Sequence, residues 1–222
     1  MTMAWQAFGV TLRLAISTTV ALGVIGLPLA YWLTFRPRRW TFLIESLVSL
    51  PIILPPTVLG FYLLMGLGPN GFIGRLWTDA TGTPIPFTFA GILIGSVLFN
   101  MPFAVRPFMA GFASVDRQLI EASWSLGVSN FTTTRRIIFP LAWPGILTGL
   151  LLTFAHTIGE FGVVLMLGGN IPGVTQTLSV LIYDEVQALN YVSANKISLS
   201  LFLFAFTVLA LLFAGSKRTK VP

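Results

Sequence analysis

Five apolar runs dominate this chain, and each is close to or above the length that a helix needs to cross a membrane. A span of the ~30 Å hydrocarbon core takes about 20 residues. The runs occupy residues 12–35, 42–67, 87–109, 140–168 and 197–214. Only 9% of the residues are charged, against roughly 25% in soluble domains. We therefore expect an all-α polytopic membrane protein with five transmembrane helices, formed by residues 1–222 as a single transmembrane domain.

Composition also excludes several classes of function. The chain has no cysteine and one histidine, which argues against a disulfide, a thiolate site or another metal centre. The net charge of +6 does not indicate nucleic-acid binding, because the basic residues stand in short clusters beside apolar runs. No G-x-x-x-x-G-K-[ST] phosphate loop is present, so the chain is not an ATPase. No constellation predicts catalysis. The first run lacks a basic leader and a nearby cleavage site, which favours a retained span.

The distribution of basic residues predicts the orientation of these spans. Ten of the thirteen Lys and Arg residues fall on one side of the predicted membrane. They are Arg36, Arg38, Arg39, Arg106, Arg117, Arg135, Arg136, Lys217, Arg218 and Lys220. Arg13, Arg75 and Lys196 remain for the other side. Because basic loops stay in the cytoplasm, we expect an external N-terminus, a cytoplasmic C-terminus and external turns at 68–87 and 168–193.

The longest polar interruption, residues 113–140, lies on the predicted cytoplasmic side. It is built as two short helices. An apolar face formed by Val115, Leu119, Ala122 and Leu126 predicts the first helix. Ser114 and Asp116 suit its start and Gly127 suits its end, while Ser129 can cap a second helix that lasts until Pro140 opens the next segment. Taken alone, the segment could be an amphipathic connector on the membrane surface.

The same segment resembles the EAA loop of bacterial ABC importer permeases. Glu121, Ala122 and Ser123 stand for Glu-Ala-Ala, Gly127 follows after three residues, and the string ending in Pro140 follows after nine more. Ser123 and Phe139 depart mildly from that pattern. The resemblance implies a cytoplasmic coupling loop at 113–140 that sits in a groove of the ATPase subunit. The implied coupling residues are Asp116, Glu121, Ala122, Ser123, Trp124, Gly127 and Pro140.

The second apolar run carries Pro51, Pro55 and Pro56, which remove amide donors and must bend or break a helix. A break in lipid requires protein neighbours or a water-lined cavity to satisfy the freed carbonyls. We expect a kink that lines a pathway, with Thr57 beside it, although a plain packing kink is the alternative. The string is similar to the second span of molybdate permeases.

The third and fourth runs supply the remaining candidates for a pathway. Glu160 is the one acidic residue inside the fourth run, where a carboxylate is costly and marks function by default. A carboxylate repels an anionic solute, so we expect it to stabilise a broken segment or a dimer contact. His156, four residues earlier, could share a proton or hydrogen bond with it, or form an ordinary interhelical bond. Asn100 could line the route or simply bond a neighbouring helix.

Nearly the whole chain resembles molybdate permeases, and Asn170-Ile171-Pro172-Gly173 favours molybdate over the similar sulfate permeases. The resemblance implies a type I ABC importer permease (MetI-like) architecture in a bacterial cytoplasmic (inner) membrane. It implies a homodimer, two cytoplasmic ATPase subunits that bind ATP and Mg, and an external oxyanion-binding protein. Molybdate, tungstate and sulfate stay open as substrates. A secondary anion carrier is the rival, but it would need more ionisable residues in the spans and an internal repeat.

Overall fold

The computed structural model describes residues 2–217, and side chains for residues 3–210. Arg218 and Lys220 of the predicted cytoplasmic tail lie outside the described residues. All regular structure in the described part is helical. The helices are α1 (Thr2–Phe35), α2 (Thr41–Ile53), α3 (Pro56–Leu67), α4 (Phe72–Thr81), α5 (Phe89–Ala113), α6 (Arg117–Ser125), α7 (Asn130–Thr133), the π-helical turn η1 (Thr134–Ile138), α8 (Phe139–Ile158), α9 (Gly162–Gly168), α10 (Leu178–Gln187) and α11 (Tyr191–Lys217).

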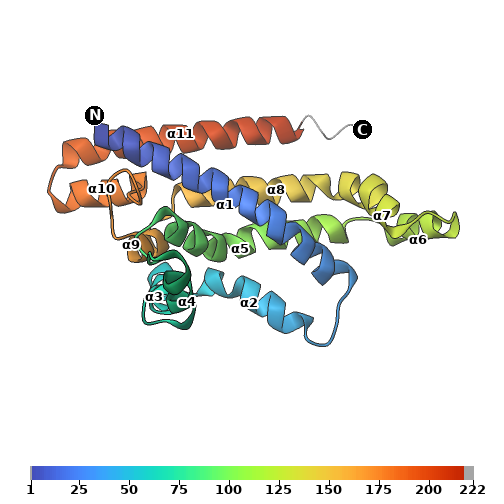
Figure 1. Cartoon of the computed structure of the whole chain (residues 1–222). Helices are drawn as coiled ribbons and strands as arrows, with labels where there is room; N and C mark the ends of the chain where they lie inside the picture. The colour runs from blue at the N-terminus through green and yellow to red at the C-terminus, as the bar shows by residue number, and fades with distance from the viewer. Residues whose placement is uncertain (1, 218–222) are drawn as a thin grey trace.

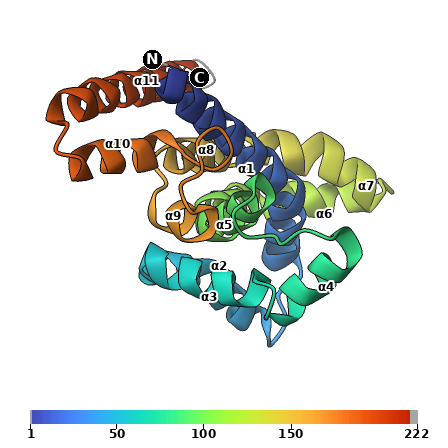
Figure 2. The ribbon, with the colours of Figure 1, turned by 60° about the vertical axis from the view of Figure 1, so that its left-hand side comes forward.

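Helices α1, α5 and α8 form the centre of the molecule, and α2, α3 and α11 lie around them (Figures 1 and 2). Their contact is apolar, with Leu22, Phe108 and Ile146 all buried in one cluster. α5 and α8 approach closely because Gly111 and Gly145 face each other, and a Cβ on either would overlap the other's backbone. Small residues of this kind let helices pack tightly where lipid gives no hydrophobic drive.

Four helices in the described part are long and apolar enough to cross a membrane, or five if α2 and α3 form one bent span. The second apolar run is therefore broken, as its prolines predict. α2 and α3 meet at an angle of 116°, and the break falls at Leu54 and Pro55, whereas Pro51 is accommodated inside α2. Pro55 and Pro56 lack the N–H groups that would continue the α2 ladder, so the chain turns and starts a new helix.

Two boundaries in the fourth run differ from the sequence prediction. Pro140 does not open a new segment, because a continuous helix runs from Asn130 to Ile158. The π-helical turn directly before the proline widens the helix, with the Phe139 N–H donating to the Thr134 carbonyl. The second difference is a break around Glu160, which separates α8 from the short helix α9.

The predicted external turns are also more regular than expected. Residues 68–87 contain α4, and residues 168–193 contain α10. Two of the glycines mark the ends of α4, where Gly71 precedes the helix and Gly82 follows it with a φ of 74°, whereas Gly74 lies inside the helix. Only glycine takes that left-handed conformation without strain.

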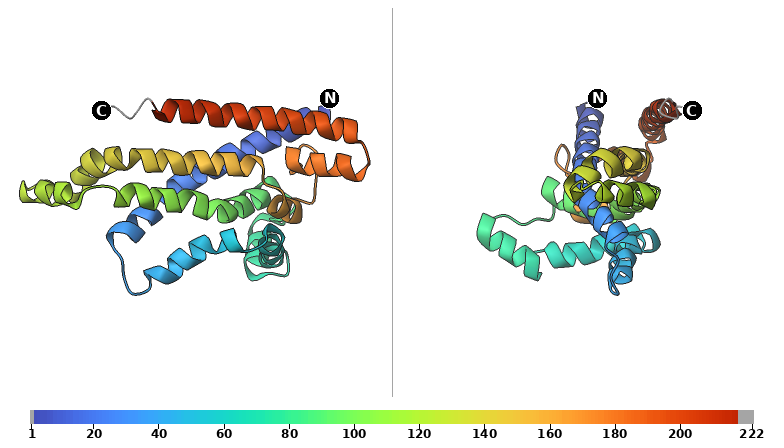
Figure 3. Two further views of the ribbon diagram at one scale, coloured as in Figure 1. Left: turned by 180° about the vertical axis from the view of Figure 1, so that it is seen from behind. Right: turned by 90° about the vertical axis from the view of Figure 1, so that its right-hand side faces the viewer.

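The molecule has two distinct ends. The start of α1 lies at the same end as α4, α9 and α10, whereas α6 and α7 protrude from the opposite end (Figures 1 and 3). Arg117, Arg135 and Arg136 lie on α6 and η1 at the protruding end, and Arg36–Arg39 follow α1 there. Arg13 lies towards the other end, its guanidinium 4.0 Å from the centroid of the Phe89 ring at the start of α5. The basic residues named here are thus divided between the two ends as the sequence predicts.

Candidate functional site

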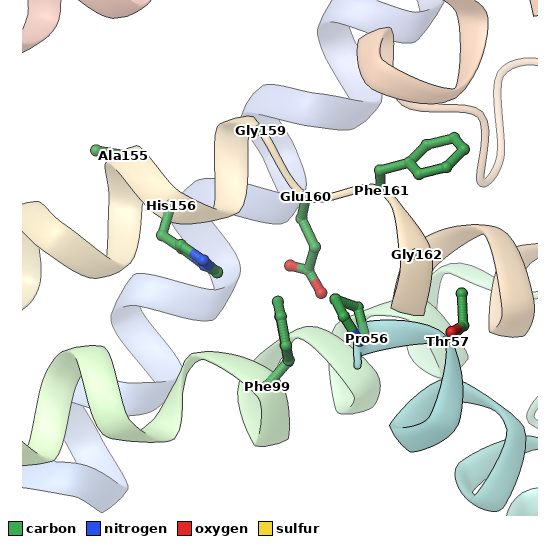
Figure 4. Close-up of a pocket in the computed structure, with 9 residues that line it drawn as sticks. All are labelled: Pro56, Thr57, Phe99, Ala155, His156, Gly159, Glu160, Phe161 and Gly162. Atoms are coloured by element: carbon green, nitrogen blue, oxygen red, sulfur yellow. The ribbon is translucent and has the colours of Figure 1, made fainter. Parts of the chain in front are cut away.

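The two broken runs meet each other at their breaks. Gly162, at the start of α9, lies against Pro56 and Thr57 at the start of α3, and a Cβ at Gly162 would be 2.9 Å from the Cβ of Pro56. A pocket of about 600 Å³ opens beside this crossing. The lining comes from α3, α5, α8, α9 and the α8–α9 break, and Figure 4 shows the Glu160 carboxylate directed towards the pocket. The full lining is Pro56, Thr57, Phe99, Ala155, His156, Gly159, Glu160, Phe161 and Gly162.

Glu160 is held by a polar network that spans from the break to α5. The Glu160 side chain is 3% exposed. Its Oε2 accepts hydrogen bonds from the Ser96 hydroxyl and from Nδ2 of Asn100, the latter at 3.1 Å. Asn100 Nδ2 also donates to the Ser96 carbonyl at 2.8 Å. The other carboxyl oxygen, Oε1, has no partner among the described residues. The network joins the break to α5.

His156 reaches Glu160 only through Asn100. Nδ1 of His156 lies 2.8 Å from Oδ1 of Asn100, and no direct His156–Glu160 bond occurs among the described side chains. The imidazole also stacks on Phe103, with ring centroids 3.9 Å apart. The direct His156–Glu160 bond that the four-residue spacing allowed is therefore absent. His156 instead forms the alternative, an interhelical bond from α8 to Asn100 on α5. The four-residue spacing does not bring the two groups together because α8 ends at Ile158, before Glu160, and Asn100 bonds both of them.

The predicted pathway residues divide into two sets. Pro56, Thr57 and Glu160 line the pocket. Pro55 precedes α3 as its N-cap residue, and Asn100 is completely buried behind Glu160, so neither contributes to the lining. Sequence reasoning missed Ser96 and Phe99. Ser96 lies one turn before Asn100 on α5, which was an available signal, but nothing in the sequence distinguishes Phe99 from other core aromatics.

At the opposite end, three local predictions for segment 113–140 are confirmed, whereas Ser114, expected at the start of the first helix, is instead the C-cap of α5. Asp116 is the N-cap of α6 and accepts a hydrogen bond from the Gln118 N–H at 2.9 Å. Ser129 is the N-cap of α7 and accepts from the Thr132 N–H at 3.3 Å. Gly127 follows α6 with a φ of 75°. Each feature rests on residues two or three apart, which is why the sequence alone predicted it.

The apolar face predicted for α6 is largely not buried against the rest of the chain. Val115 is buried, but Leu119 is exposed and Leu126 is 82% exposed. The buried side of α6 carries Ile120 and Ser123 instead, and the Ser123 hydroxyl bonds the Thr133 hydroxyl at 2.7 Å. This bond ties α6 to α7. Leu119 and Leu126 remain exposed on the other side of the helix, where a partner could contact them.

Three other predicted coupling residues are exposed as well. Ala122 and Pro140 are exposed, and Trp124 is about half exposed. Glu121 forms an ion pair with Arg117, with Nε and Oε1 3.1 Å apart. Its carboxylate therefore bonds neither the backbone of the segment nor any other described residue.

These features define an α-helical membrane protein with a pocket between broken spans and a protruding helix pair at one end. The chain belongs to the family of binding-protein-dependent transport system inner membrane components, whose model matches residues 23–218. It is thus a membrane component of such a transport system and not its ATP-hydrolysing subunit.

Individual relatives agree with that family. The chain is 44% identical to the molybdenum transport system permease protein of Azotobacter vinelandii, over 96% of this chain and 94% of the relative. It is 32% identical to a probable sulfate transport system permease protein of Chlorella vulgaris, over 96% of this chain and 79% of the relative. Its fold is similar to a chain of a bacterial alginate ABC transporter, with a TM-score of 0.78 at 17% identity, covering 97% of this chain and 79% of that one.

Proposed function

We propose that this chain is the permease subunit of an ATP-driven importer of molybdate. The observation that carries the proposal is the 44% identity to a molybdenum permease over nearly the full length of both chains. Sulfate is the second candidate, supported by the weaker similarity to sulfate permeases. Tungstate shares the tetrahedral dianionic shape and stays within the proposal.

The proposed assembly contains two copies of this chain, two ATPase subunits and an external binding protein. The family description, which names a binding-protein-dependent system, supports the external partner. The exposed apolar side chains of Leu119, Trp124 and Leu126, on α6 and at its end, support an ATPase contact at that end. ATP and Mg belong to the ATPase subunits, and this chain carries no cofactor of its own.

In this assembly the pocket end and the α6–α7 end have separate roles. Pro55, Pro56, Thr57, Asn100 and Glu160 belong to the translocation pathway or its support. Asp116, Glu121, Ala122, Ser123, Trp124, Gly127 and Pro140 belong to the coupling surface. When ATP brings the two ATPase subunits together, each carries one α6–α7 pair with it, and the pathway between the two permease copies switches between inward-facing and outward-facing states.

The proposed orientation places α6 and α7 in the cytoplasm and the N-terminus, α4 and α10 outside. Because the chain has no cysteine, single cysteines report the side directly. An impermeant thiol reagent should label Ala80→Cys in intact cells and should label Ser125→Cys only after the cells are opened. The reverse pattern would contradict the orientation.

Uptake into proteoliposomes tests the function itself. The complex of this chain with its ATPase and binding protein should accumulate radiolabelled molybdate only with ATP, and unlabelled tungstate should compete more strongly than sulfate. ATP-dependent uptake of sulfate with no uptake of molybdate would show that sulfate is the substrate and would contradict the molybdate assignment. Uptake that follows an ion gradient without ATP would instead favour a secondary carrier.

A further inference from the structure

Arg106 lies deeper in the molecule than the sequence indicates. The sequence places it at the end of the third apolar run, but α5 continues to Ala113. At 1.5 Å per residue, Arg106 is about 10 Å before that helix end. Its partner Ser49 lies on α2, about 12 Å from the start of that helix at Thr41 by the same measure. Both helices therefore place the guanidinium within their membrane-spanning length.

The guanidinium is held in place without being neutralised. Nε and Nη2 of Arg106 donate to Oγ of Ser49 at 3.0 and 2.6 Å. Ser49 uses its own hydroxyl proton on the Glu45 carbonyl at 2.6 Å, so its lone pairs face the arginine. A guanidinium has five N–H donors, and Ser49 occupies two of them. The only ion pair among the described side chains is Arg117–Glu121, so no described carboxylate pairs with Arg106.

Arg106 shares one face of α5 with the pocket. Phe99, Phe103 and Arg106 follow one another at spacings of four and three residues, which places them on the same side of a helix. Phe99 lines the pocket, and Phe103 stacks on the pocket residue His156. Arg106 is exposed and lies about 10 Å further along the axis from Phe99. An intramembrane arginine normally faces a water-filled cavity or another protein chain rather than lipid.

We propose that Arg106 contacts the oxyanion during translocation, on the α6–α7 side of the pocket. A guanidinium donates parallel hydrogen bonds to the oxygens of a tetrahedral anion, which an ammonium matches less well. In a two-fold symmetric dimer the partner copy would supply a second Arg106 on the same pathway. A single cation from each chain attracts the dianion without a closed cage, so the anion can leave again. This inference rests on the proposed oxyanion import.

The test uses the complete complex in proteoliposomes, with molybdate uptake and binding-protein-stimulated ATP hydrolysis measured on the same preparations. Arg106→Gln should lower the initial uptake rate at least tenfold and leave stimulated ATP hydrolysis within twofold of wild type. The initial uptake rate of Arg106→Lys should lie between the rates of Arg106→Gln and wild type. Arg39→Gln is the matched control, because it removes an equal charge from the exposed loop after α1. It should transport at the wild-type rate.

Each outcome decides the inference. Wild-type uptake by Arg106→Gln would overturn it, as would equal losses of uptake and ATP hydrolysis, which indicate a structural role. A similar loss in Arg39→Gln would assign the effect to overall charge and overturn it as well. If Arg106→Gln does not assemble, Arg106→Lys decides: at least threefold lower uptake with intact ATP hydrolysis supports the contact, and unchanged uptake refutes it. A wild-type complex that transports no oxyanion would instead refute the proposed function.

Discussion

The two ends of this molecule hold their polar groups in opposite ways. In the α6–α7 segment the caps are local, since Asp116 bonds a backbone group two residues away and Ser129 one three residues away. At the pocket, Glu160 is bonded by Ser96 and Asn100, which lie 64 and 60 residues earlier in the chain. The first region is exposed and leaves an apolar side uncovered. The second is buried and depends on three helical segments being in place together.

This difference predicts how each region responds to substitution. Changes in the α6–α7 segment should affect the contact with a partner and leave the membrane helices folded. Changes in the Glu160 network should affect stability and transport together, because a buried donor without an acceptor destabilises the fold.

The largest effect is expected for Glu160→Ala. The substitution removes the acceptor of the Ser96 hydroxyl and the Asn100 amide, and each buried donor left unpaired costs about 1–3 kcal/mol. The purified complex should lose several degrees in its unfolding midpoint and at least tenfold in uptake. Glu160→Gln keeps an acceptor oxygen of the same shape and is the matched control, with a smaller loss. An unfolding midpoint of Glu160→Ala equal to wild type would show that the network does not support the break.

A second large effect is expected for Gly127→Val. Gly127 has a φ of 75°, and a left-handed conformation costs an L-residue roughly 1–2 kcal/mol, with β-branched residues worst. The end of α6 should shift, and uptake and retention of the ATPase should fall about tenfold. Gly82→Val imposes the same strain beside α4, where φ is 74°. The Gly82→Val control should transport at the wild-type rate. An equal loss of uptake in both variants would show that the defect of Gly127→Val is not specific to coupling.

A moderate effect is expected where the two breaks touch. A Cβ at Gly162 would approach the Cβ of Pro56 to 2.9 Å, whereas a Cβ at Gly159 would meet only the His156 carbonyl at 3.8 Å. Gly162→Ala should force α3 and α9 apart and destabilise the protein by about 1–3 kcal/mol. Gly159→Ala should be close to wild type in thermal unfolding and uptake. If the two variants behave alike, the crossing is looser than the structure indicates.

The smallest effect on stability is expected for Glu121→Ala. The Arg117–Glu121 pair is exposed, and such pairs within a helix contribute about 0.3–0.5 kcal/mol. Thermal unfolding should therefore be nearly unchanged, while ATPase retention decreases because the carboxylate is lost from the coupling surface. Arg117→Ala breaks the same ion pair and keeps Glu121. Equal retention by both variants and wild type would remove Glu121 from the coupling surface.

The sequence predicted what depends on neighbouring residues. Apolar length predicted the spans, the prolines predicted the break near Pro55, and the glycine at position 127 predicted a left-handed helix end. The Pro140 boundary was wrong because a single π-helical turn absorbs the proline. The prediction of turns at 68–87 missed α4, because Gly71 and Gly82 are the caps of a helix and not parts of a helix-free loop.

The composition of the pocket could not be predicted in the same way. The Ser96–Glu160 bond and the contact of Gly162 with Pro56 join residues from separate helices, and their register follows from packing. A direct bond between His156 and Glu160 was one of two alternatives and relied on spacing within one helix, whereas the structure has the other, an interhelical bond from His156 to Asn100. The depth of Arg106 was hidden because an apolar run does not show where its helix ends.

Cross-linking can show directly that the α6–α7 end contacts the ATPase subunit. Leu126 is 82% exposed at the end of α6, and Phe72 is 81% exposed at the start of α4 on the opposite end. Each position is replaced by cysteine in this cysteine-free chain and carries a short photo-cross-linker in the assembled complex. The account predicts a cross-link from Leu126→Cys to the ATPase subunit and none from Phe72→Cys. A complex in which Leu126→Cys yields no ATPase adduct, or no more than Phe72→Cys does, would contradict it.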